Sequence, residues 1–149
     1  MSISVTIDRN VWKRSPPVTR LARSAARAAL KVANIDSSEC DLAVIFADDA
    51  TVAELNRKWR GKAKPTNVLS FPASQRAGGR FLGDVLLAAG VIEREAEDEG
   101  KPLLNHAAHL IVHGVLHLLG YDHGKASAAR RMRQMEVRAL KSLGMDDPY

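Results

Sequence analysis

All five histidines of this 149-residue chain lie between His106 and His123. The strongly apolar pattern over residues 102–120 predicts a central helix. Four of the histidines fall on it at intervals of three, four and four residues, so at about 100° per residue they form one stripe about 80° wide. Any fold of this chain must therefore place a line of imidazoles on a largely apolar helix.

The stripe brings two imidazoles within reach of one ion. His113 and His117 lie one turn apart, roughly 6 Å along the helix axis, so both can bind one metal at about 2.0–2.1 Å. Gly120 lets the chain leave the helix and turn back, which brings His123 to the same point. Three neutral nitrogen ligands are typical of an open, catalytic zinc site, where water takes the fourth position and is activated by the ion. Imidazoles also bind nickel, copper and iron, so zinc is the default expectation.

Two interpretations of the histidines without catalysis stay open. They can be satisfied core residues, or they can form a closed structural zinc site with Asp122 or His109 as the fourth ligand. We expect His109 and Asp122 to orient the ligands from outside instead. Asp84, which follows Gly83 at the start of a strand, is a further candidate for such an outer position.

Hydrophobic periodicity predicts the other elements. The expected strands span residues 2–7, 42–46, 67–71 and 83–88. The expected helices span residues 17–33, 49–61, 91–99, 102–120 and 127–143. Because strands and helices intermix without strict alternation, the predicted class is α+β: a small mixed four-stranded sheet with about five helices packed on it. Trp12 and Trp59 are expected in the core, and residues 73–80 in a mobile loop.

Length and composition narrow the class of protein. A chain of 149 residues with 46% apolar content suits a single domain, expected over residues 1–149. The longest clean apolar stretch, residues 85–92, is far shorter than the roughly 18 residues that a membrane span needs. The single Cys40 can form neither an intramolecular disulfide nor a thiolate metal cluster, so we expect a reducing cell interior.

The positive charges are unevenly distributed. The net charge is +5, and most Lys and Arg residues fall in three blocks, residues 9–31, 57–80 and 125–141. The first two blocks contain no acidic residue. Such a distribution favours a phosphate-bearing partner, although any one block can also be an ordinary solvated surface.

The spacing HxxxHxxGxxH also occurs in the metzincin proteases, whose first ligand is followed by a glutamate that acts as general base. Gly114 takes that position here. A metallopeptidase that lacks the usual base is therefore a weak alternative.

Three sequence strings together resemble a known family. They are HGVLHLLGYDH at 113–123, TNVLSFP at 66–72 and LGDVLL at 82–87. The chain resembles the bacterial endoribonuclease YbeY family, from about residue 42 to the final DDPY. The resemblance implies a metal-dependent, single-strand-specific ribonuclease of the cytoplasm that processes the 3′ end of 16S rRNA and serves ribosome quality control. It implies His113, His117 and His123 as metal ligands and Arg60 as a functionally important arginine. Asn67 stands where the family often has aspartate.

The chemistry of the residues agrees with that resemblance. A metal and a guanidinium can together neutralise the phosphate oxygens during cleavage, and we expect Arg60 and His113 to be catalytic. The alternative for Arg60 is a cation that complements a helix C-terminus. We expect an RNA backbone to be contacted by further basic residues around the same loop: Lys62, Lys64, Arg76 and Arg80. Expected partners are single-stranded RNA, rRNA and the small ribosomal subunit with its proteins, and neither DNA nor a membrane.

Several points stay open from the sequence. The TNVLSFP strand is expected in the core, although an exposed edge there can pair with an extended substrate. Tyr121 and Tyr149 can stack on a base. Without a glutamate beside the metal, either an activated water or the RNA 2′-hydroxyl attacks the phosphate. A noncatalytic ribosome-binding module with structural zinc is the alternative from another class.

Overall fold

The computed structural model describes residues 3–8, 15–61, 66–73, 81–122 and 124–149. Its four strands form one sheet in the order β1-β2-β4-β3, with bounds Ile3–Ile7, Asp41–Ala47, Phe81–Ala88 and Val68–Pro72 respectively. β1 pairs parallel with β2 and β2 parallel with β4, whereas β3 is antiparallel to β4. The sheet is therefore mixed, as predicted.

In the described part of the chain five α-helices cover this sheet, and the predicted α+β class is confirmed. They are α1 Ser15–Val32, α2 Asp49–Arg60, α3 Ala89–Glu99, α4 Leu103–Leu118 and α5 Ala126–Ser142. The short 3-10 helix Ser37–Glu39 was not predicted; Asp36 begins it by accepting a hydrogen bond from the Ser38 backbone N–H at 2.9 Å. None of the described helices is both long and apolar enough to cross a membrane.

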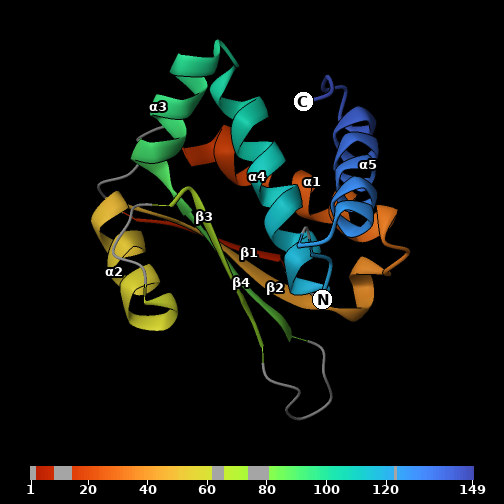
Figure 1. The fold of residues 1–149 in the computed structure, drawn as a ribbon, viewed down its shortest axis with the longest axis horizontal. Coiled ribbons are helices and arrows are strands. Elements are labelled where there is room, and N and C mark those ends of the chain that lie inside the picture. Colours follow the sequence, from red (N-terminus) through yellow and green to blue (C-terminus); the bar gives the residue numbers. More distant parts are fainter. Residues whose placement is uncertain (1–2, 9–14, 62–65, 74–80, 123) are drawn as a thin grey trace.

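The two faces of the sheet bury different helices. On β2, Leu42, Val44 and Phe46 alternate toward a core that they share with α1, α4 and α5. The opposite face packs a smaller cluster around Val52 of α2 and Leu69 of β3. Figure 1 shows α2 on one side of the sheet and α1, α4 and α5 on the other. Because alternate strand residues face opposite sides of the sheet, α1 and α5 share a core with the histidine helix α4, whereas α2 packs on the other side.

α4 lies close to the sheet because of one glycine. A Cβ built on Gly114 would come within 2.6 Å of Val85 Cγ1, closer than real Cβ atoms pack. The Ser70 hydroxyl on β3 donates a hydrogen bond to the Gly114 carbonyl oxygen at 2.9 Å. Position 114 therefore faces the sheet, and its neighbour His113 is on another side of the helix.

Asp48 begins α2, and Asp49 links two helices. The Asp48 carboxylate accepts the Thr51 backbone N–H at 2.7 Å, while the Asp49 carboxylate accepts the Val91 backbone N–H at 3.1 Å at the start of α3. Gly61, at φ +69°, ends α2 in the left-handed region that glycine tolerates.

The expectation that Trp59 is a core residue was wrong. Val52 is fully buried on the inward stripe of α2, but Trp59 is 65% exposed. Every described side chain of α2 after Asn56 is exposed. The stripe was therefore correct in angle, but within the described residues the last turn of the helix is not buried. Trp12 and residues 74–80 of the expected mobile loop lie outside the described residues.

Candidate metal centre

Two ring nitrogens converge on α4. The Nε2 atoms of His113 and His117 lie 3.0 Å apart, and the ring planes meet at 77°. Two nitrogens bound to one tetrahedral ion at 2.0–2.1 Å would be roughly 3.3 Å apart. The donor set therefore fits a shared transition-metal ion with only a small adjustment of either ring. The His113 side chain is 23% exposed, so solvent can reach this point.

The chain turns back directly after these histidines. Gly120 has φ +96°, and the Tyr121 backbone N–H donates to the Leu116 carbonyl oxygen at 3.1 Å. The Asp122 carboxylate accepts the Gly124 backbone N–H at 2.9 Å, across position 123. Asp122 thus ties Gly124 to the end of the described segment 81–122. His123 itself lies outside the described residues, and within those residues no group of three or more His, Cys, Asp or Glu side chains is arranged to hold a metal.

A buried carboxylate holds the other nitrogen of His113. Glu136 of α5 has a side chain only 2% exposed, and its Oε2 accepts a hydrogen bond from His113 Nδ1 at 2.9 Å. Its Oε1 accepts one from His109 Nε2 at 2.6 Å and one from the Tyr149 hydroxyl at 2.5 Å. In the neutral ring of His113, a proton on Nδ1 leaves the lone pair on Nε2, the atom that faces His117.

Glu136 is ionised in this environment. Burial raises the pKa of its carboxyl, but the hydrogen bonds from His109, His113 and Tyr149 outweigh burial and lower the pKa to about 2. Tyr149 shows the reverse effect, because burial and the hydrogen bond to Glu136 raise the pKa of its phenol. A carboxylate bonded to a metal-binding imidazole in this way fixes the tautomer and the orientation of the ring.

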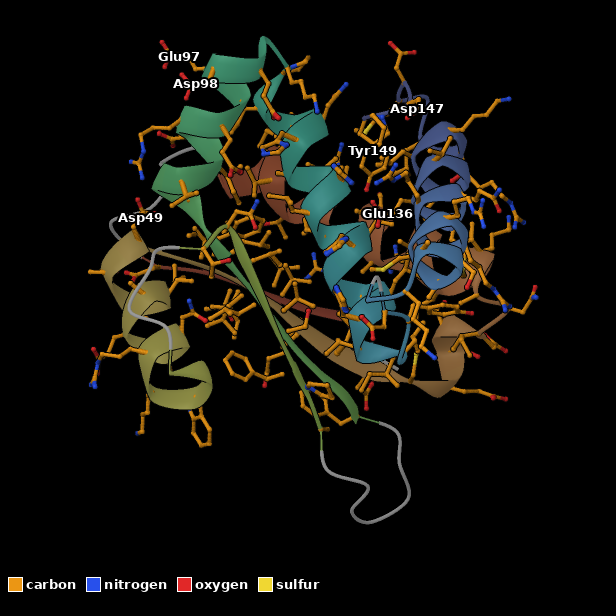
Figure 2. All side chains as sticks on the ribbon, in the orientation of Figure 1. Asp49, Glu97, Asp98, Glu136, Asp147 and Tyr149 are labelled. Carbon is orange, nitrogen blue, oxygen red and sulfur yellow. The ribbon has the colours of Figure 1, made fainter. Side chains whose placement is uncertain are left out.

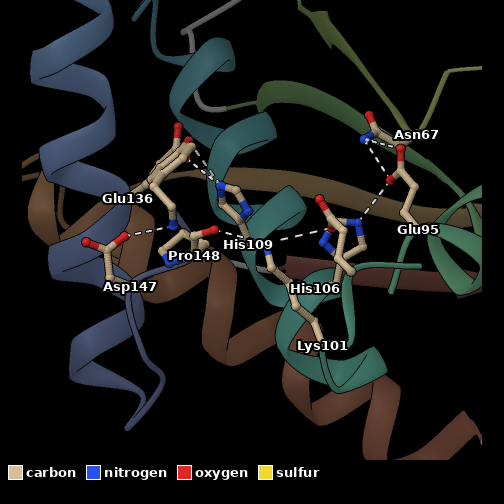
Figure 3. A network of polar contacts seen from close by, with 10 residues as sticks. Asn67, Glu95, Lys101, His106, His109, Glu136, Asp147 and Pro148 are labelled. Atoms are coloured by element: carbon tan, nitrogen blue, oxygen red, sulfur yellow. Dashed lines mark hydrogen bonds and ion pairs between the residues drawn. The ribbon is translucent and has the colours of Figure 1, made fainter. Parts of the chain in front are cut away.

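A second histidine and carboxylate pair lies nearer the start of α4. His106 is buried, and its Nε2 lies 2.9 Å from Glu95 Oε1 on α3. Asn67 donates to the same oxygen at 3.0 Å (Figure 3). An aspartate at position 67 would place two carboxylates together, which explains physically why an amide suits this chain.

Comparison with known proteins identifies the family. The family model described as Endoribonuclease YbeY matches residues 6–144. A protein named Endoribonuclease YbeY from Rhodopseudomonas palustris is 44% identical over 97% of this chain and 88% of its own length. Another of that name from Methylocella silvestris is 42% identical over 99% of this chain and 85% of its own. The chain belongs to the endoribonuclease YbeY family.

A solved structure agrees on the fold of this YbeY family member. A Thermotoga maritima protein solved in solution matches with a TM-score of 0.60 at 20% identity, covering 96% of this chain and 92% of its own. At that identity the match supports the fold alone. Membership of the YbeY family, together with a position 114 that faces the sheet, sets aside the metallopeptidase alternative.

The basic residues predicted to contact RNA in this YbeY family member fall outside the described side chains. Arg60 is the last residue of α2, and its side chain is not described. The other four positions, Lys62, Lys64, Arg76 and Arg80, lie outside the described residues. Asp84 lies on β4 opposite Phe71, and burial raises the pKa of its carboxyl. Among the described residues, no hydrogen bond joins Asp84 to the histidines.

Sequence reasoning missed Glu136. It lies in the basic block of residues 125–141, and the signal was available: Glu136 is the only acidic residue of that block. It shares the buried stripe of α5 with Met132, Met135 and Ala139. An isolated carboxylate on an apolar stripe needs a partner, and the histidine stripe of α4 supplies it.

Proposed function

We propose that this YbeY family member is a metal-dependent endoribonuclease that cleaves single-stranded RNA. His113, His117 and His123 hold one ion, with zinc as the default metal. The observation that supports this is the convergence of His113 and His117 at 3.0 Å, with His113 held at its other nitrogen by Glu136. Relatives that are 42–44% identical over at least 97% of the chain are named endoribonucleases.

Each protein group has a defined task in this proposal. When bound, the ion supplies a Lewis acid that polarises the scissile phosphate and lowers the pKa of a water. Glu136 keeps His113 in the tautomer that presents Nε2, and Ser70 holds the intervening backbone of α4 against β3. The Arg60 guanidinium neutralises charge that develops on the phosphate oxygens. The basic residues Lys62, Lys64, Arg76 and Arg80 bind the RNA backbone.

The finer assignment concerns the RNA and its place in the cell. We assign the activity to maturation of the 16S rRNA 3′ end and to ribosome quality control, with the small ribosomal subunit and its proteins as partners in the cytoplasm. The net charge of +5 and two long segments without acidic residues favour such a polyanionic partner. The single cysteine, Cys40, is buried, which is compatible with a reducing compartment.

An RNA cleavage assay with end mapping tests this function. Purified protein of measured metal content is given a labelled single-stranded RNA, the same RNA in a duplex, and single-stranded DNA. We expect cleavage of the first substrate only, and loss of that cleavage in His113→Ala. A 5′-phosphate on the product indicates attack by water, and a 2′,3′-cyclic phosphate indicates attack by the 2′-hydroxyl. Wild-type protein that leaves all three substrates intact at full metal loading contradicts the proposal.

A further inference from the structure

The two oxygens of Glu136 have separate partners. Oε2 faces the candidate ligand His113, whereas Oε1 accepts from His109 and from the Tyr149 hydroxyl. The side chain is almost fully buried, so these three donors rather than water stabilise its charge. The position of the carboxylate therefore depends on where the three donors lie.

Tyr149 reaches Glu136 from a segment that is itself anchored. In residues 145–149, the Pro148 carbonyl oxygen accepts a hydrogen bond from Lys101 Nζ at 2.9 Å, and the Asp147 carboxylate accepts the Tyr149 backbone N–H at 2.8 Å (Figure 3). The Arg133 guanidinium lies 4.6 Å from the centroid of the Tyr149 ring. Figure 2 shows Tyr149 next to Glu136, between α4 and α5. The phenol is thus directed at the carboxylate by contacts of its segment to Lys101, which precedes α4, and to Arg133 of α5.

These contacts form one chain of hydrogen bonds from Tyr149 to the metal centre. We propose that Tyr149 is a positioning residue: its hydroxyl fixes the Glu136 carboxylate, which fixes the ring and the tautomer of His113 and so sets the affinity for the metal. The inference rests on the proposed function only in taking His113 as a ligand. Losing a partner outside the ligands typically costs 10–100-fold in metal affinity.

Glu95 and His106 provide an internal control. His106 lies on α4 like His113, and its Nε2 is 2.9 Å from Glu95 Oε1, the same distance that separates His113 Nδ1 from Glu136 Oε2. Glu95 is 37% exposed, and His106 is not among the expected ligands. A Glu95→Gln variant therefore removes a similar interaction without touching the chain of bonds that ends at Tyr149.

Metal affinity tests the proposal without any measurement of catalysis. Zinc is titrated into the full-length apo protein in competition with a chromophoric chelator of known affinity. We expect Glu136→Gln to bind zinc about 10–100-fold more weakly, and Tyr149→Phe about 3–10-fold more weakly. Glu95→Gln is expected to stay within about twofold of wild type. In the double variant Tyr149→Phe/Glu136→Gln, we expect no loss beyond that of Glu136→Gln, because Tyr149 acts through Glu136.

Imidazole NMR of the apo protein gives a second readout. Long-range ¹H–¹⁵N spectra distinguish the two neutral tautomers of histidine, and we expect His113 to carry its proton on Nδ1 in wild type. In Tyr149→Phe, the other tautomer of His113 should become detectable, which a loss of packing alone would not produce. Tyr149→Phe removes one oxygen atom from a partly exposed residue, so this variant stays informative if Glu136→Gln does not fold.

Unchanged zinc affinity in Tyr149→Phe overturns the inference, and so do losses that simply add in the double variant. Failure of the proposed function has a different signature. If RNA is never cleaved but zinc affinity responds as expected, the positioning role holds and the nuclease assignment fails. If RNA is cleaved and zinc affinity is unchanged in Tyr149→Phe, the nuclease assignment holds and the positioning role fails.

Discussion

The Ser70 hydroxyl donates to the Gly114 carbonyl oxygen at 2.9 Å, between the two histidines that converge on α4. This bond and the missing side chain at Gly114 let α4 lie directly on β3 and β4. The distance between α4 and the sheet therefore determines where His113 and His117, the two candidate metal ligands, lie relative to the core.

Substitution of Gly114 tests that relationship. In Gly114→Ala, the added Cβ meets Val85, and this overpacking lowers the free energy of unfolding by about 1–3 kcal/mol. The higher helix propensity of alanine offsets ~1 kcal/mol of that loss. Gly114→Glu recreates the metzincin pattern. We expect it to lower the free energy of unfolding by about 4 kcal/mol or more and to produce no peptidase activity. Urea unfolding measures the stability of the two Gly114 variants, with Glu97→Ala on the exposed face of α3 as control. A stable Gly114→Glu protein would refute the packing argument.

Arg57 provides a control for Arg60, because both arginines lie in the last turn of α2. Arg57 is exposed and paired with Glu54, so Arg57→Ala should leave RNA cleavage nearly unchanged. Arg60→Ala should reduce kcat by about 10²–10³-fold if its guanidinium stabilises the transition state. Single-turnover rates on one RNA compare them, with circular dichroism to check folding. Equal cleavage rates in the two variants would contradict a catalytic role for Arg60 and would favour the alternative, a cation that complements the C-terminus of α2.

The ionised Glu136 predicts a loss of stability in acid. Its pKa is lowered to about 2, because three hydrogen bonds outweigh the effect of burial. A carboxyl whose folded pKa lies below its unfolded value contributes stability that is full above the unfolded pKa and is lost as pH falls through the folded one. The apo protein should therefore lose stability from about pH 4.5 toward pH 2, more steeply than Glu136→Gln. Parallel pH profiles for the two proteins would contradict this.

Metal removal separates a catalytic from a structural site. The core shared by α1, α4, α5 and the sheet is built from apolar side chains such as Leu30, Phe46 and Ile111. We therefore expect the chelated protein to stay folded but inactive, with its far-ultraviolet circular dichroism retained. Unfolding on chelation would favour the noncatalytic module with structural zinc.

Local pattern was enough to predict the sheet and the histidine stripe, because both follow from fixed periods of two and about 3.6 residues. Glu136 was missed because periodicity identifies the buried stripe of α5 but not the helix that faces it. Trp59 was misplaced because the period gives an angle around the helix, whereas burial also depends on how far the sheet extends beneath α2. The Asn67 contact with Glu95 likewise joins residues 28 apart in sequence.

Stoichiometric reconstitution tests the central claim most directly. Apo protein is titrated with zinc, and the rate of single-stranded RNA cleavage is followed at each addition. We predict no cleavage without metal and a linear rise that ends at one ion per chain, with no recovery in His113→Ala. Full cleavage by metal-free protein, or equal recovery in His113→Ala, would contradict a metal centre built on the histidines of α4.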